Sequence, residues 1–99
     1  NVGTMAVVTA EALMAIAFAQ LVRPGSPMLF GVPAMTVALN TGAPVHGSPD
    51  SAIVQFLAGQ MARRYGIPHR AIANCATSKS ADMQAGYDSM WGLFPSLDR

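Results

Sequence analysis

The sequence predicts an α/β fold whose elements run in the order helix, strand, helix, strand, helix. Three segments have helical patterns, two short apolar runs lie between turn residues, and the two kinds of segment alternate along the chain. Strands that alternate with helices indicate parallel β/α units. The predicted segments are, in order, 4–21, 27–31, 48–65, 69–73 and 81–91.

The first helix is predicted over Thr4–Leu21, an alanine-rich stretch without glycine or proline. Alanine and leucine are strong helix formers, and apolar side chains fall on almost every face, as in a helix packed between other elements. Arg23, Pro24 and Gly25 predict its end, because arginine suits a last helical turn and proline stops propagation.

The second and third helices have recognisable starts. Ser48 is a capping residue, followed by proline and aspartate, which suit the first helical turn. Apolar residues then recur at spacings of three and four until Gly66, which predicts the helix end. The third helix is predicted over 81–91, with Ser80 as its cap and Asp82 in its first turn.

The predicted strands are joined through long or polar loops. The run 27–31 is continuously apolar, which suits a strand buried on both faces, and 69–73 is less apolar. Residues 32–47 form a long connection, of a length that is usually functional or disordered, and 74–80 is a polar loop. Because two strands alone make a marginal sheet, residues 1–99 are expected to form about two β/α units of a larger α/β protein rather than a complete domain.

Composition excludes several classes of protein. Only 11% of the residues are charged, against about 25% in an average soluble domain, whereas 52% are apolar and the mean hydropathy is +0.34. This hydrophobicity excludes disorder, and a net charge of +1 leaves no electrostatic footprint for nucleic acid. The single cysteine, Cys75, rules out an intramolecular disulfide framework and fits a reducing compartment.

The excess of apolar residues indicates either a membrane span or a surface covered by protein outside this sequence. The most apolar window, 5–22, contains Glu11 and Gln20, which disfavours a span. No basic stretch typical of a signal peptide precedes it. We therefore expect no membrane association and a surface that other protein covers.

Candidate functional residues lie in the loops that follow the two predicted strands, which is where a β/α barrel places its active site. His46 is a possible base or ligand donor, or an ordinary hydrogen-bonded loop histidine. Cys75 is a possible nucleophile or a half-buried filler. Lys79 is available to bind an anion or to pair with Asp82. The sequence has no metal-ligand spacing, and the helix start at Ser48 offers a weak anion site.

Several separate motifs, in order over nearly the whole chain, resemble one family. They are Leu-Val-Arg-Pro-Gly-Ser-Pro at 21–27, Thr-Gly-Ala-Pro at 41–44 with Gly-Ser-Pro at 47–49, Ala-Arg-Arg-Tyr-Gly-Ile-Pro at 62–68, and Ser-Lys-x-x-Asp-x-Gln-Ala-Gly-Tyr at 78–87. Together they resemble the trimethylamine methyltransferase family, the corrinoid-dependent amine and betaine methyltransferases.

The resemblance implies a (β/α)8 TIM barrel several times longer than this chain. It implies transfer of a methyl group from trimethylamine or a quaternary amine such as glycine betaine to the cobalt of a corrinoid (cobalamin) that a separate protein carries. Founding members of the family use pyrrolysine, and this chain contains none. It also implies a cytoplasmic, oligomeric transferase of the kind used in methanogenesis, with no cofactor bound by this segment itself.

The resemblance also selects site candidates, although it identifies no catalytic residue and no metal ligand. Two positions depart from the family pattern: His46 replaces an apolar or aromatic residue, and Asn74 with Cys75 replaces glycines. The candidates facing substrate or corrinoid that the motifs carry are Thr41, Gly42, Lys79, Asp82 and Gln84, and Asn40, His46 and Asn74 join them from the two loops. Two alternatives stay open: a non-catalytic relative that binds a quaternary amine or a partner, and an unrelated barrel enzyme that holds phosphate at the Ser48 helix.

Overall fold

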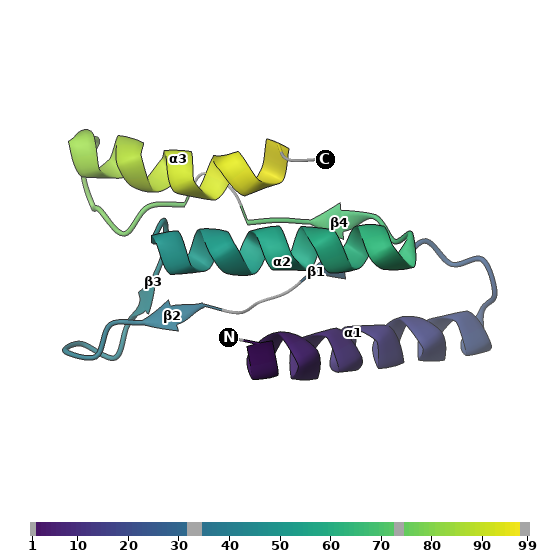
Figure 1. Cartoon of the computed structure of the whole chain (residues 1–99). Helices are drawn as coiled ribbons and strands as arrows, with labels where there is room; N and C mark the ends of the chain where they lie inside the picture. Colours follow the sequence, from purple (N-terminus) through teal and green to yellow (C-terminus); the bar gives the residue numbers. More distant parts are fainter. Residues whose placement is uncertain (1, 32–34, 73–74, 98–99) are drawn as a thin grey trace.

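A computed structural model describes residues 2–31, 35–72 and 75–97. Three helices are arranged side by side, with α2 between α1 and α3, and short strands lie alongside them (Figure 1). The elements, in chain order, are α1 (Val2–Val22), β1 (Phe30–Gly31), β2 (Thr36–Val37), β3 (Pro44–Val45), α2 (Pro49–Tyr65), β4 (His69–Arg70) and α3 (Met83–Leu97).

The strands β1 and β4 form a parallel pair, with Phe30 opposite His69 and Gly31 opposite Arg70. The Phe30 amide donates to the Pro68 carbonyl at 2.8 Å. The helix α2 lies between these strands in the chain and makes the crossover that a parallel pair requires. The predicted parallel β/α unit is therefore confirmed, although both strands are shorter than the runs 27–31 and 69–73.

The bounds of α2 follow the predicted capping residues. Ser48 has an extended backbone (φ −82°, ψ 154°), and its hydroxyl accepts from the Ser51 amide at 3.2 Å. At the other end Gly66 is left-handed (φ 66°), and its amide donates to the carbonyls of Ala62 and Arg63. Local sequence alone fixes both ends of this helix.

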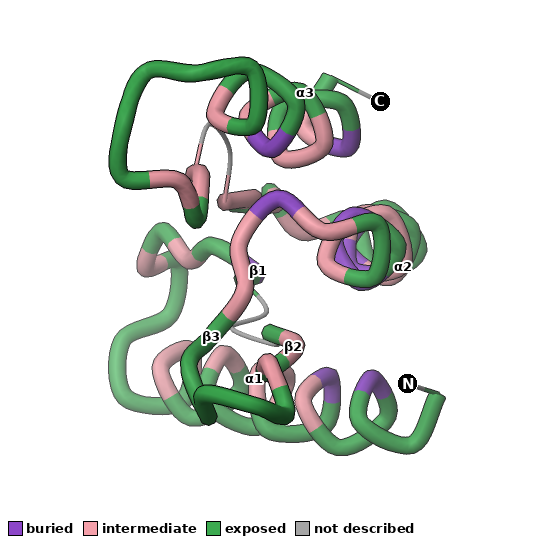
Figure 2. The backbone as a smooth tube through the Cα atoms, turned by 90° about the vertical axis from the view of Figure 1, so that its left-hand side faces the viewer, coloured by how far each residue is buried: buried purple, intermediate pink, exposed green. Residues whose placement is uncertain are grey.

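The core is small and centred on α2. Phe30 is fully buried and packs with Ala58, Ala62 and Val54 of α2 and with Met5 of α1. Figure 2 shows the same distribution, since buried positions follow α2 while most of α1 is exposed. The side chain of Phe30 in β1 therefore packs against both α1 and α2.

Residues 36–45 form an antiparallel hairpin within the predicted long connection 32–47. Thr36 pairs with Val45, and Val37 pairs with Pro44. The turn between them is closed by the Gly42 amide, which donates to the Ala38 carbonyl at 2.8 Å with Gly42 at φ 69°. Strands of two residues are too short to show the alternation by which a strand is recognised.

The third helix starts later and ends later than predicted. Asp82, not Ser80, caps it: its carboxylate accepts from the Ala85 amide at 2.9 Å. The helix runs on to Leu97 through Pro95. A proline removes one backbone hydrogen bond, and here the helix continues only two residues beyond it.

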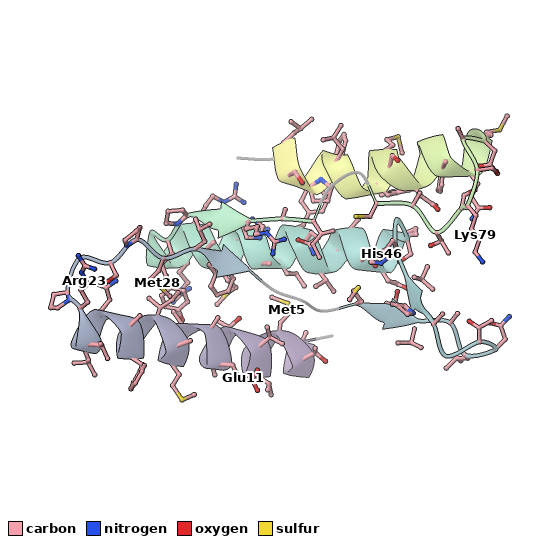
Figure 3. The ribbon with its side chains drawn as sticks, turned by 180° about the vertical axis from the view of Figure 1, so that it is seen from behind. Met5, Glu11, Arg23, Met28, His46 and Lys79 are labelled. Carbon is pink, nitrogen blue, oxygen red and sulfur yellow. The ribbon has the colours of Figure 1, made fainter. Side chains whose placement is uncertain are left out.

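The helix α1 is exposed along most of its length. Figure 3 shows Met5 pointing toward the rest of the chain and Glu11 pointing away from it. By length and composition alone α1 would suit a membrane span, although core helices of soluble proteins pass the same test. The predicted helix is confirmed, but within the described residues only one side of it is covered. Large apolar side chains on its exposed side include Val7, Met14, Phe18 and Leu21.

The packing of His69 predicts a pH-dependent stability. Its ring lies 6.4 Å from that of Phe30, and burial first, then the Arg63 guanidinium, lowers the pKa of His69 from its ordinary value of 6.5. As pH falls, the unfolded chain therefore takes up this proton before the folded chain does. The stabilisation that comes from neutral His69 is complete above about pH 6.5. It is lost as the pH falls through the pKa that His69 has in the folded protein.

We expect His69→Gln to gain stability relative to the unsubstituted protein as the pH falls from 8 to 5. The measurement is urea unfolding of the protein encoded by the complete gene, with both versions at each pH. A difference in unfolding free energy that does not change with pH would contradict the prediction.

Candidate functional site

The loops that follow β1 and β4 meet at one edge of the molecule. The loop after β1 contains the hairpin and ends at His46, and the loop after β4 leads through Thr77 to α3. In Figure 3, His46 and Lys79 lie at this same end. The carboxyl ends of parallel strands share one edge of a sheet, which brings together residues 31 positions apart.

The contact between these loops is made by the hydroxyl of Thr77. It accepts from the His46 amide at 3.1 Å and donates to the His46 carbonyl at 3.0 Å. The Thr77 amide in turn donates to the carboxylate of Asp88 on α3 at 3.1 Å. Three segments distant in sequence are therefore joined at one point.

Gly47 lies directly against Asp88. Its backbone is left-handed (φ 73°), and a Cβ atom there would lie 2.7 Å from the Asp88 carbonyl oxygen and would also overlap its Cα and Cβ. Only glycine fits this position, for both its φ angle and its space. The helix α2 begins two residues later, at Pro49, so this contact holds the segment that leads into the helix.

A cavity of about 30 Å³ lies beneath this corner, between the first turns of α2 and helix α3. His46, half-buried Cys75 and Trp91 are among its lining residues. Gln55 also lines it and is only 6% exposed, and its Oε1 has no hydrogen-bond partner within the described chain. The space has room for one or two water-sized molecules and is too small for a bulky ligand.

The hairpin turn carries three predicted candidates away from His46. Asn40, Thr41 and Gly42 are exposed at the turn. The Thr41 hydroxyl accepts from the Ala43 amide at 3.3 Å, which stabilises the turn itself. Asn74 lies outside the described residues, and Gln84 is exposed in the first turn of α3.

Asp82 satisfies the backbone at the start of α3. Besides the Ala85 amide, its carboxylate accepts from the hydroxyls of Ser78 at 2.9 Å and Ser80 at 3.1 Å. These hydrogen bonds, the Ala85 amide first, hold the pKa of Asp82 below its ordinary value. Lys79 is exposed, and its possible partner Asp82 bonds to serines instead.

Neither a metal site nor a phosphate site stands out among the described residues. Within residues 2–31, 35–72 and 75–97, no three His, Cys, Asp or Glu side chains gather as metal ligands do. At the start of α2 the hydroxyls of Ser48 and Ser51 are engaged with each other at 3.0 Å and with the backbone. No observation favours a phosphate there.

The sequence analysis missed Gly47, Gln55, Thr77 and Asp88. A lone aspartate inside an otherwise uncharged helix was the one available signal for Asp88, because burial of a carboxylate requires a hydrogen-bond donor. Thr77 carries no such signal, since its partner is the backbone of a residue in another loop.

The chain matches the family model described as Trimethylamine methyltransferase (MTTB) over residues 1–98. It is 37% identical over 91 residues to a glycine betaine methyltransferase of Desulfitobacterium hafniense (strain Y51), covering 92% of this chain and 19% of the relative. It is 32% identical over 96 residues to a trimethylamine methyltransferase MttB of Methanosarcina thermophila, covering 96% of this chain and 20% of the relative.

A third relative is a proline betaine:corrinoid methyltransferase of Eubacterium limosum. It is 29% identical over 80 residues, which cover 81% of this chain and 16% of the relative. The chain thus spans between 16% and 20% of the length of these three relatives.

The contact of Gly47 predicts an unusually costly substitution. We expect Gly47→Ala to lower the unfolding free energy by about 3 kcal/mol or more, because it adds overpacking to the cost of a left-handed alanine. Gly66→Ala is the matched control: its φ angle is similar (66°) and nothing lies within 4 Å of the added methyl group. The control should cost about 1–2 kcal/mol.

Both variants are compared by urea unfolding of the complete protein. Equal losses of stability for the two glycines would show that the contact with Asp88 does not constrain the chain.

Proposed function

Because this chain belongs to the trimethylamine methyltransferase family, we propose that the complete protein transfers a methyl group from a methylated amine to the cobalt of a corrinoid carried by a partner protein. The observation that carries this proposal is the family match over 98 residues, supported by relatives named for trimethylamine, glycine betaine and proline betaine. The methyl donor is accordingly trimethylamine or a quaternary amine such as glycine betaine.

We also propose that residues 1–99 form about two β/α units of a (β/α)8 barrel. The parallel pair β1–β4 with its crossover helix α2 supports this arrangement. The exposed apolar side chains of α1 and α3, such as Phe18 and Phe94, support it too, because neighbouring units would cover them. A barrel of this kind takes about 250 residues.

In such a barrel the corner at His46 and Thr77 faces the active site, because catalytic residues lie at the carboxyl ends of the strands. A quaternary ammonium has no proton to give up, so a protein holds it by aromatic faces or carboxylates. The cavity described above is too small for a trimethylammonium group. The substrate pocket would therefore be completed by parts of the barrel outside this chain.

The cavity beneath His46 is also too small for a corrinoid. In the proposed arrangement, a corrinoid carried by a partner would approach the exposed hairpin and the Lys79 loop from outside. The corrinoid, when bound, supplies the reactivity that accepts the methyl group, and the barrel supplies position and electrostatics.

The direct test is methylation of cob(I)alamin, followed by its absorbance, with the complete protein and its corrinoid partner. We expect the cob(I)alamin spectrum to be lost with trimethylamine or with glycine betaine, and the active amine identifies the substrate. No change with a panel of methylamines and betaines would refute the proposal. Calorimetric binding of a quaternary amine without turnover would instead support a non-catalytic relative.

The proposed incomplete barrel predicts that the isolated 99-residue polypeptide associates with itself, because its apolar faces have no cover. Light scattering should give a mass above that of the 10.3 kDa monomer. Phe18→Glu should reduce this association, whereas Glu11→Gln on the exposed side of the same helix should not.

A monodisperse monomer that unfolds cooperatively would contradict the prediction. Sedimentation of the complete protein with lipid vesicles would contradict the proposed barrel instead, because it would assign the apolar face of α1 to a membrane.

A further inference from the structure

The Thr77 hydroxyl makes an unusual pair of contacts with one residue. It accepts from the amide of His46 and donates to the carbonyl of the same residue, at 3.1 and 3.0 Å. Both backbone groups of His46 are therefore satisfied by a single side chain 31 residues further along. A serine hydroxyl could make both bonds as well, whereas valine, which has the shape of threonine, could make neither.

The backbone of Thr77 is itself held in place by a residue of α3. The Thr77 amide donates to the Asp88 carboxylate at 3.1 Å, and Asp88 is only 8% exposed. A hydrogen bond from a backbone amide to a carboxylate is among the stronger kinds. Gly47 meanwhile lies flush against Asp88, so the corner 46–47 is held on two sides by the pair Thr77 and Asp88.

The corner is also where the hairpin joins α2. The Ser51 hydroxyl of α2 donates to the Val45 carbonyl at 3.3 Å, and Thr36 of the hairpin lies 3.3 Å, oxygen to oxygen, from the Ser48 hydroxyl. Movement at His46 would therefore move the hairpin as well. The loop after β4 carries Cys75, which lines the same cavity as His46.

We infer that Thr77 and Asp88 are positioning residues that hold the hairpin corner at His46 and the loop after β4 in one fixed arrangement at the active-site edge. The role in methyl transfer rests on the proposed function; the clamp itself does not. Thr77 and Asp88 act through His46 and its neighbours and need not touch the substrate. Geometry that is loosened by even about 1 Å lowers enzymatic rates up to about 100-fold.

The test compares Thr77→Val, which keeps the shape and removes both hydroxyl bonds, with Thr77→Ser, which keeps the hydroxyl. In the complete protein we expect amide hydrogen exchange over residues 36–47 to become about tenfold faster in Thr77→Val, as two net hydrogen bonds are lost. Thr77→Ser should stay within about threefold of the unsubstituted protein. Thr4→Val on exposed α1 is the matched control and should change nothing in these peptides.

The kinetic arm measures methyl transfer with the same variants. We expect kcat to fall about tenfold in Thr77→Val with little change in KM for the amine, and Thr77→Ser to restore it. Asp88→Asn keeps an acceptor for the Thr77 amide, so its kcat should lie between those of Thr77→Val and Thr77→Ser. Should Thr77→Val fail to fold, Thr77→Ala makes the same comparison.

Each outcome decides one part of the inference. Unchanged exchange in Thr77→Val would refute the clamp. Faster exchange with unchanged kcat would refute the positioning role. An inactive unsubstituted protein would refute the proposed function and with it the positioning role, while the exchange experiment would still decide whether the clamp exists.

Discussion

Parallel pairing of β1 with β4 is the constraint on which the rest of the structure depends. Because the two strands run in the same direction, the chain must cross over between them, and α2 makes that crossing. The loops after both strands then lie at the same edge. Without this geometry His46 and Thr77, 31 residues apart, would have no reason to meet. Phe30 secures the arrangement, since it is fully buried beneath the helices that it joins.

The sequence predicted those features whose causes are local. Ser48 and Gly66 fix the ends of α2 through their own backbone angles and hydrogen bonds, and both are recognisable as residue types at their positions. The parallel pairing followed from the alternation of segments. The hairpin was missed because its strands have two residues each. The sequence predicts Ser80 as the cap of α3, but Asp82, two positions later, has the side chain that reaches the Ala85 amide.

Contacts between loops could not be predicted, for a physical reason. The side chain of Thr77 bonds to the backbone of His46, and backbone groups are present at every position, so no residue pattern marks the partner. The requirement for glycine at position 47 likewise comes from Asp88, which is 41 positions away in the chain. Composition, in contrast to loop contacts, does give a usable prediction. The shortage of charged residues predicts apolar faces without cover in this chain, and α1 has such a face.

The structure also explains part of the similarity by which the family is recognised. Several motif residues have local structural tasks: Asp82 caps α3, Thr41 closes the hairpin turn, and Ser48 caps α2. Such residues identify the fold that carries the chemistry and need not take part in it. Thr77 and His46 lie between those motif positions, at a point where both loops and α3 meet.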